Sequence, residues 1–148
     1  MRTSDQLYFD RAHTFAPLMQ KAHYLSWSKT LDKPKEKTCL QYAMWTLAAS
    51  LSSQFQMTRG ELYAEARRVL DDLEIESQNT SAKCIEQPQA WMLLSICELI
   101  SDHFQRGLAS AGRAFRLIQL MQLDEVDIHA PTSFQRDWVD TESIRRTF

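Results

Sequence analysis

The stretch Pro88–Asp127 decides the fold, and it reads PQAWMLLSICELISDHFQRGLASAGRAFRLIQLMQLDEVD. Its apolar residues recur at steps of three and four positions, which is typical of α-helices that bury one face. A polar segment, Asp102–Arg106 followed by Gly107, separates two such patterns. The pattern therefore predicts two helices joined by a polar hinge, with the second helix ending near Leu123.

Small residues open the second of these helices, at positions Ala109–Gly112. Small side chains allow the backbone of a neighbouring helix to come close, and larger side chains further along the helix can then fill the core. We therefore expect Gly112 to lie at a close helix–helix contact. We also expect two large aromatic side chains of the pair, Trp91 and Phe115, to be buried.

Helical spacing extends over most of the remaining chain. It predicts further helices at Thr38–Phe55 and Glu61–Glu74, with a break at Thr58–Gly60 between them, and a last helix that begins near Thr141. No segment shows the alternation of a β-strand. We predict an all-α protein with a single domain over residues 1–148. It is expected to be an irregular stack of antiparallel helix pairs, with about five to seven helices.

The helix predicted at Glu61–Glu74 carries two pairs of opposite charge. Arg67 is paired in sequence with Asp71, and Arg68 with Asp72, at the spacing that brings side chains together on one helix face. We expect both pairs to form on the outer face of this helix. Each would stabilise it by about 0.2–0.5 kcal/mol.

Length and composition are those of an ordinary globular protein. The 148 residues suffice for one hydrophobic core, with 44% hydrophobic residues, 24% charged residues and a net charge of −2. Because nucleic-acid binding needs a basic surface, this charge gives no case for direct contact with DNA or RNA. The N-terminus is too polar for a signal peptide, and no apolar run has the length of a membrane span. We expect a reduced, intracellular protein without membrane contact.

Residues that commonly carry catalysis or bind metals form no motif in the chain. The four histidines lack the spacing of a zinc site, and Cys39, Cys84 and Cys97 are too widely spaced for a disulfide framework. Cys97 is expected to be a small buried residue of an apolar helix. A nucleophilic cysteine–histidine pair would require a proximity that sequence does not show. We predict no catalytic residue, no metal and no cofactor, and we favour a protein that is not an enzyme.

Aromatic residues are abundant, and four of them are tryptophans. Most are expected to fill the core. Ligand pockets between helices are also lined by apolar and aromatic side chains, so some of these residues are candidates for binding a hydrophobic small molecule. The candidates are Trp27, Trp45, Trp91 and Tyr42.

Five segments in a fixed order resemble a known family. They are LYFDRAHTFAPL at Leu7–Leu18, LQYAMWTLAA at Leu40–Ala49, LYAEARRVL at Leu62–Leu70, the helix pair described above, and WVDTESIRRTF at Trp138–Phe148. Together they resemble the fungal-specific transcription factor domain, the all-helical middle homology region of fungal zinc-cluster regulators. The six-cysteine zinc cluster of that family is absent from this chain, and the family domain runs on beyond the last segment.

The resemblance implies the N-terminal half of a nuclear regulatory domain that modulates transcription through protein or metabolite contacts. In the family, DNA binding and zinc belong to a separate module. The surface on which further helices of the family domain would pack is expected to be apolar, and another protein surface must then cover it. We therefore expect a homodimer, or a contact with another protein chain, at Trp138 and Phe148.

Two other functions are open at this stage. A stand-alone relative without the DNA-binding module could bind, or act on, a hydrophobic small molecule of secondary metabolism. A helical-repeat interaction scaffold is the second alternative, because Tyr63–Leu70 and Gly107–Phe115 have the small-then-large pattern of tetratricopeptide helices. A true tetratricopeptide array repeats about every 34 residues, and these two segments are farther apart than that.

Overall fold

Four long helices form the frame of the protein: α3 (Lys35–Ser50), α4 (Gln56–Ser77), α5 (Glu86–Ile100) and α6 (Phe104–Leu120). The shorter elements are α1 (Ser4–Leu7), η1 (Tyr8–Ala12), α2 (Lys21–Ser28) and η2 (Ser53–Phe55). The computed structural model describes residues 3–77, 84–121 and 146–147, and every regular element within these ranges is helical. The predicted all-α class is confirmed for this part of the chain.

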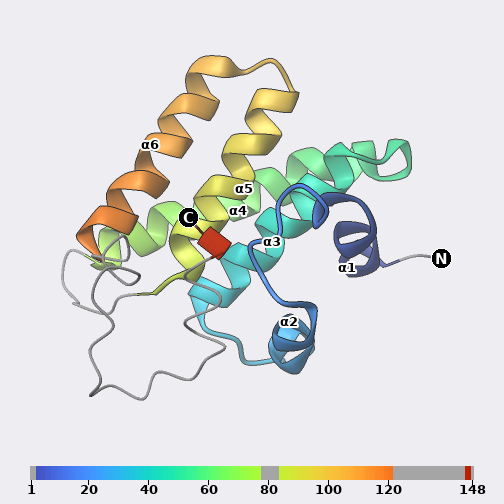
Figure 1. Cartoon of the computed structure of the whole chain (residues 1–148), viewed down its shortest axis with the longest axis horizontal. Helices are drawn as coiled ribbons and strands as arrows, with labels where there is room; N and C mark the ends of the chain where they lie inside the picture. Colours follow the sequence, from blue (N-terminus) through green and yellow to red (C-terminus); the bar gives the residue numbers. More distant parts are fainter. Residues whose placement is uncertain (1–2, 78–83, 122–145, 148) are drawn as a thin grey trace.

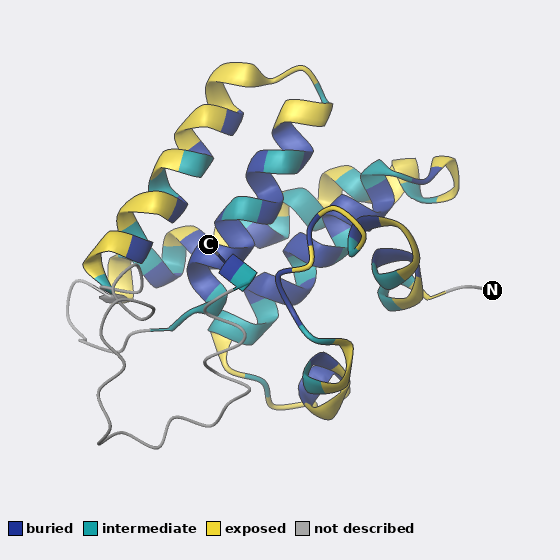
Figure 2. Ribbon diagram, in the orientation of Figure 1, coloured by how far each residue is buried: buried dark blue, intermediate teal, exposed yellow. Residues whose placement is uncertain are grey.

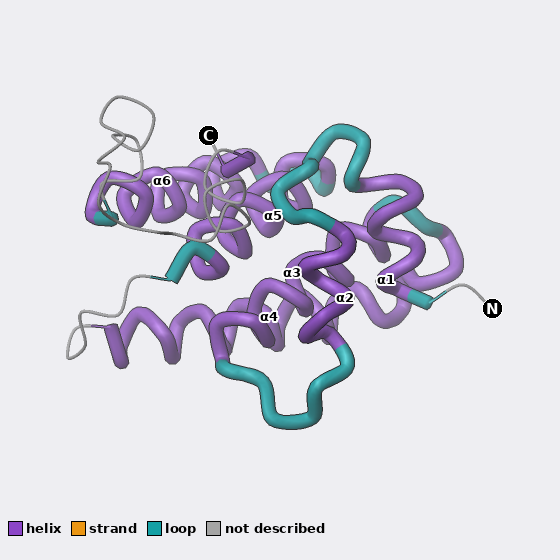
Figure 3. The backbone as a smooth tube through the Cα atoms, turned by 60° about the horizontal axis from the view of Figure 1, so that its bottom comes forward, coloured by secondary structure: helices purple, strands orange, loops and turns teal. Residues whose placement is uncertain are grey.

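Helix α3 lies at the centre of the frame. It packs against both α4 and α5, and α5 in turn packs against α6 (Figure 1). Figure 3 shows the layers from another side, with α5 and α6 above α3 and with α4 below it. The predicted stack of antiparallel helix pairs is therefore present.

The apolar faces of these helices meet in one continuous core (Figure 2). Its largest fully buried apolar side chains on the long helices are Leu40, Met44, Leu47, Leu70, Trp91, Leu93 and Leu94. Full burial of such a side chain stabilises a fold by about 1.5–3 kcal/mol. Because α3 supplies apolar residues on several of its faces, it can contact helices on both sides.

The segment before α3 is attached to it by polar contacts around Asp5. The Asp5 carboxylate in α1 accepts a hydrogen bond of 2.5 Å from the Trp45 indole in α3. It also accepts one from the Tyr24 hydroxyl in α2. Hydrogen bonds to a charged group contribute about 1.5–3 kcal/mol each. One carboxylate thus connects three helices.

Helix α4 differs from its prediction because it contains the residues expected to break it. It begins at Gln56 and continues through Thr58–Gly60, so the predicted break is wrong. A glycine inside a helix costs only about 1 kcal/mol relative to alanine. The packing of this long helix against α3 outweighs that cost. Helix α3 is also displaced from its prediction, since it covers Lys35–Ser50 rather than Thr38–Phe55.

The connection between α5 and α6 is shorter than the predicted hinge. It comprises residues 101–103, and α6 already includes Arg106 and Gly107. Asp102 has a φ of 61°, a left-handed conformation that aspartate adopts more readily than most residues. This single residue turns the chain, so a longer polar hinge is not needed. Helix α6 ends at Leu120 rather than near Leu123.

Gly107, and not Gly112, is the glycine at the close contact between α5 and α6. A β-carbon on Gly107 would lie 2.8 Å from Leu99 Cγ and 3.3 Å from the Ser95 carbonyl oxygen. A β-carbon on Gly112 would meet no heavy atom within 4 Å. The two positions differ by about 140° around the helix, so only one can face α5. The expected close contact at Gly112 is therefore wrong.

Alanine substitutions at the two glycines should have opposite consequences. Both gain about 1 kcal/mol from helix propensity, but only Gly107→Ala forces atoms into an occupied space, at a cost of about 1–3 kcal/mol. We expect the free energy of unfolding of Gly107→Ala to lie about 1–3 kcal/mol below that of Gly112→Ala. Urea unfolding of both variants measures this difference. Equal stabilities would contradict the close approach at Gly107.

Trp91 and Phe115, both predicted to be buried, have different environments. Trp91 is fully buried, as predicted, but Phe115 is 61% exposed. The face of α6 that meets α5 consists of Gly107, Ser110, Ala114 and Ile118. Phe115 follows that face by one position and so lies at its exposed edge. The prediction of a buried Phe115 is wrong.

Two predictions concern residues outside the described ranges. They are the last helix from Thr141, of which only residues 146–147 are described, and the partner contact at Trp138 and Phe148. Both stay predictions.

Candidate functional site

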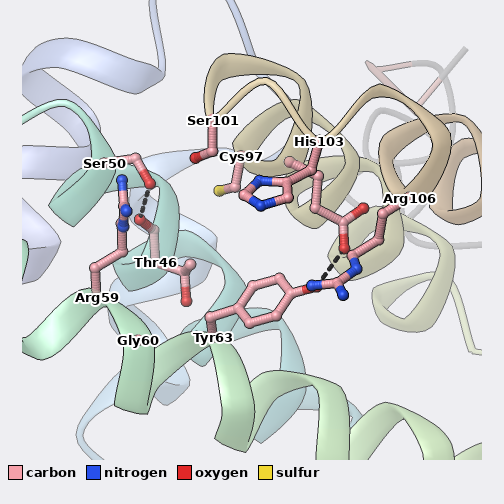
Figure 4. Close-up of a pocket in the computed structure, with 10 residues that line it drawn as sticks. Thr46, Ser50, Arg59, Gly60, Tyr63, Cys97, Ser101, His103 and Arg106 are labelled. Carbon is pink, nitrogen blue, oxygen red and sulfur yellow. Dashed lines mark hydrogen bonds between the residues drawn. The ribbon is translucent and has the colours of Figure 1, made fainter.

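A polar cavity of about 160 Å³ lies where α3, α4, α5 and the beginning of α6 meet (Figure 4). Each helix contributes polar side chains to its wall, although these residues are far apart in sequence. The lining residues are Thr46, Ser50, Arg59, Gly60, Tyr63, Cys97, Glu98, Ser101, His103 and Arg106. We call this space the polar cavity.

Glu98 is the buried charge at the wall of the polar cavity. Only 3% of it is exposed, and its Oε1 accepts hydrogen bonds from the Tyr63 hydroxyl and, at 3.1 Å, from the Arg67 guanidinium. The Ser110 hydroxyl donates to Oε2 at 2.6 Å. A buried carboxylate is tolerated when it is paired and hydrogen-bonded in this way. The network connects α4, α5 and α6.

The pKa of Tyr63 reflects this environment. Burial raises the pKa of its hydroxyl first, and the hydrogen bond to Glu98 raises the pKa further. The Tyr63 hydroxyl therefore stays protonated and remains a donor to the carboxylate at neutral pH.

Two arginine side chains lie over the ring system of Trp91. The guanidinium carbons of Arg67 and Arg113 lie 5.0 Å and 4.7 Å from the centre of its ring system. Arg113 also forms an ion pair of 3.5 Å with Asp71. Cation–π contacts with a buried ring contribute about 2 kcal/mol. Trp91 thus holds α5 against arginines from α4 and α6.

These contacts correct one predicted charge pair and confirm the other. Arg67 binds Glu98 rather than Asp71, which pairs with Arg113 instead. Arg68 forms the expected pair with Asp72 at 3.0 Å. Arg67 points inward because a buried carboxylate on another helix attracts it more strongly than an exposed one on its own helix.

Cations outnumber anions around the polar cavity. Arg59 and Arg106 both line it, and no carboxylate among the described residues lies within ion-pair distance of either guanidinium. The one carboxylate in the wall, Glu98, is already paired with Arg67. The cavity is therefore suited to a ligand that brings negative charge.

Cys97 and His103 both line the polar cavity, which brings together a cysteine and a histidine. The nucleophilic form of a cysteine is the thiolate. Burial raises the pKa of the Cys97 thiol to about 12. The thiol is therefore protonated at neutral pH, and the geometry favours a wall residue over a catalytic nucleophile. The prediction that Cys97 is buried is confirmed.

A second space, the apolar groove, lies between α5 and α6. Its volume is about 490 Å³. It is lined by Met92, Ser95, Ile96, Ala111, Ala114, Phe115, Ile118, Gln119 and Thr147. Two more large apolar side chains of α6, Phe104 and Leu108, are exposed along the same helix (Figure 2 shows its exposed outer edge).

The four aromatic residues predicted to bind a ligand line neither the polar cavity nor the apolar groove. Trp27 and Trp91 are buried in the core. Trp45 and Tyr42 are half-buried side by side on α3, with ring centres 5.6 Å apart. Ligand binding by these four residues stays a prediction, and their described contacts are with other side chains of the protein.

The residues of the polar cavity were missed by reasoning from sequence. Arg59, His103 and Arg106 lie on two different helices and a turn, and no spacing connects them. Glu98 does carry a signal, because it is the one acid in the apolar run WMLLSICELI. A charge at such a place must be paired or close to a site. That signal indicates a partner but cannot name Arg67.

The described residues show neither a metal centre nor a membrane helix. No three histidine, cysteine, aspartate or glutamate side chains among them lie close enough together to bind a metal ion. No helix in the described ranges has the length and apolar character needed to cross a bilayer.

Comparison with known proteins defines the class to which this helical segment is related. The chain is homologous to part of several fungal transcription factors of secondary metabolism. It spans about a quarter of the length of these relatives. No protein-family model matches the chain, and no solved structure matches it significantly.

Three relatives illustrate the match. The pigment biosynthesis transcriptional activator pigB of Monascus ruber is 48% identical over 97% of this chain and 27% of its own length. The tropolone cluster transcription factor tropK of Talaromyces stipitatus is 42% identical over 97% of the chain and 26% of its own. The citrinin biosynthesis transcriptional activator ctnR of Monascus purpureus is 39% identical, with 97% and 25% covered.

Proposed function

We propose that this chain is the regulatory segment of a nuclear transcription regulator that controls a gene cluster of fungal secondary metabolism. The observation that carries the proposal is the alignment of 97% of the chain with activators of pigment and citrinin biosynthesis and with a tropolone cluster factor. The ordered segments that resemble the middle homology region support the finer assignment to the zinc-cluster type. DNA contact and zinc would then belong to another part of the regulator.

A regulatory segment acts through contacts, and α6 offers a surface for one. Phe104, Leu108 and Phe115 are exposed at helical spacing, and Phe115 continues into the apolar groove. We propose that the apolar face of an amphipathic helix of another protein chain binds here.

Removing the apolar contact without disturbing the fold tests this surface. Leu108→Ser combined with Phe115→Ser changes two exposed side chains, so the free energy of unfolding should change by about 0.5 kcal/mol or less per site. When the variant replaces the natural gene, we expect transcripts of the regulated genes to fall at least about tenfold, because apolar anchors dominate helix binding. Quantitative measurement of those transcripts checks this result. Leu31→Ser, at a fully exposed side chain outside the groove, is the matched control.

Two results would contradict the α6 proposal. Unchanged transcripts in the double variant would show that this face makes no functional contact. A wild-type dimer in light scattering that the double variant converts to a monomer would identify the partner as a second copy. That outcome would favour the homodimer expected from the family resemblance over a different partner chain.

A further inference from the structure

We propose that the polar cavity binds a small organic acid about one aromatic ring in size, with its carboxylate on Arg59. This effector site deepens the proposed function, because a regulatory role for the ligand rests on that function. The inference that the ligand binds rests only on the geometry of the cavity.

The unpaired cation in the cavity wall favours an anion at one end. Arg59 is half-buried, and no described carboxylate pairs with it. In Figure 4 its guanidinium lies beside Ser50, at the side of the cavity away from the Glu98 network. A partly desolvated guanidinium binds a carboxylate strongly, often through two parallel hydrogen bonds. The negative group of the ligand is therefore placed at Arg59.

The opposite end of the cavity favours a neutral hydrogen-bonding group. Figure 4 shows Arg106 beside Tyr63, and the Tyr63 hydroxyl donates to Glu98. Glu98 would repel a second carboxylate placed near it. His103 also lies along this part of the wall and can donate or accept a hydrogen bond. A hydroxyl group on the ligand satisfies these side chains without an unfavourable charge.

The size of the cavity limits the ligand. Its volume is about 160 Å³, and an engineered protein cavity of roughly 150 Å³ takes up benzene. One ring with small substituents therefore fits. Gly60 lines this space, and a β-carbon there would meet no heavy atom within 4 Å, so there is room for a larger side chain.

Titration of the purified 148-residue chain with 4-hydroxybenzoate tests the proposal. A ligand of about ten heavy atoms should bind at a single site with a Kd on the order of 1 mM. 4-Hydroxybenzamide has the same shape without the charge, and we expect it to bind at least about tenfold more weakly. Calorimetry or NMR chemical shifts measure both ligands.

Variants separate this cavity from other binding places. Arg59→Gln removes the cation and should weaken 4-hydroxybenzoate at least about tenfold. Gly60→Leu fills the space and should abolish binding, while its melting temperature stays the same or rises because leucine favours helices. Arg116→Gln removes an exposed arginine of α6 outside the cavity and should bind like the wild type.

Three results would overturn the cavity proposal: no saturable binding of the acid, equal binding of the amide, or unchanged binding in both Arg59→Gln and Gly60→Leu. None of these results affects the proposed role in transcription, because that role rests on the alignment. Conversely, Arg59→Gln could abolish binding by the purified chain and yet leave the transcripts unchanged in a strain that carries it. That pair of results would confirm the site and contradict its regulatory use.

Discussion

Trp91→Ala is expected to lower the free energy of unfolding by about 3–5 kcal/mol, which is a large part of the stability of a small domain. The ring is fully buried, and truncation leaves a cavity in the hydrophobic core. It also removes the cation–π contacts to Arg67 and Arg113. Chemical denaturation monitored by circular dichroism gives the difference from the wild type.

Phe115→Ala is the matched aromatic control for Trp91→Ala. Its side chain is mostly exposed on α6, so its loss should change the free energy of unfolding by about 0.5 kcal/mol or less. If both variants lost the same stability, α6 would be rotated relative to its position described above. Wild-type stability of Trp91→Ala would contradict the location of the core.

Arg67→Ala should destabilise the protein by about 3–5 kcal/mol, because it leaves the Glu98 carboxylate buried without its cation. Exposed ion pairs contribute about 0–1 kcal/mol, so Arg68→Ala should cost far less. Arg68 is a suitable control, since it neighbours Arg67 on α4 and pairs with Glu65 and Asp72 at the surface. Denaturant unfolding of the two variants measures the contrast.

A double-mutant cycle separates the ion pair from other effects of Arg67→Ala. When Glu98→Ala is added, no charge stays buried, so the double variant should lose less stability than the sum of the two single variants. Additive losses would show that Arg67 and Glu98 do not interact. The stability lost in Arg67→Ala would then come from the other contacts of Arg67, with Trp91, Tyr63 and Ser110.

Periodicity predicted the helices and the burial of Trp91 because these features depend on neighbours along the chain. The rotation of α6 was not predicted. Its small residues include two glycines, and only the three-dimensional contact with Leu99 and Ser95 distinguishes Gly107 from Gly112. Phe115 was misplaced for the same reason, since the apolar residues of α6 form both an inner and an outer face.

The polar cavity was beyond the reach of sequence reasoning because its wall comes from four helices. Asp71 has the ideal helical spacing for a pair with Arg67. The buried carboxylate of Glu98 on α5 nevertheless attracts Arg67 more strongly. Arg59 lay in the predicted break and Arg106 in the predicted polar hinge, so no sequence pattern connected them. A cavity joins them only after α3, α4, α5 and α6 have packed.

Deleting the gene and measuring the transcripts of neighbouring biosynthetic genes tests the central claim most directly. The regulatory account predicts that these transcripts fall together and that expression of the natural gene restores them. The stand-alone alternative predicts a different pattern, in which one metabolite disappears or changes. Loss of that metabolite with unchanged transcripts would contradict the regulatory account.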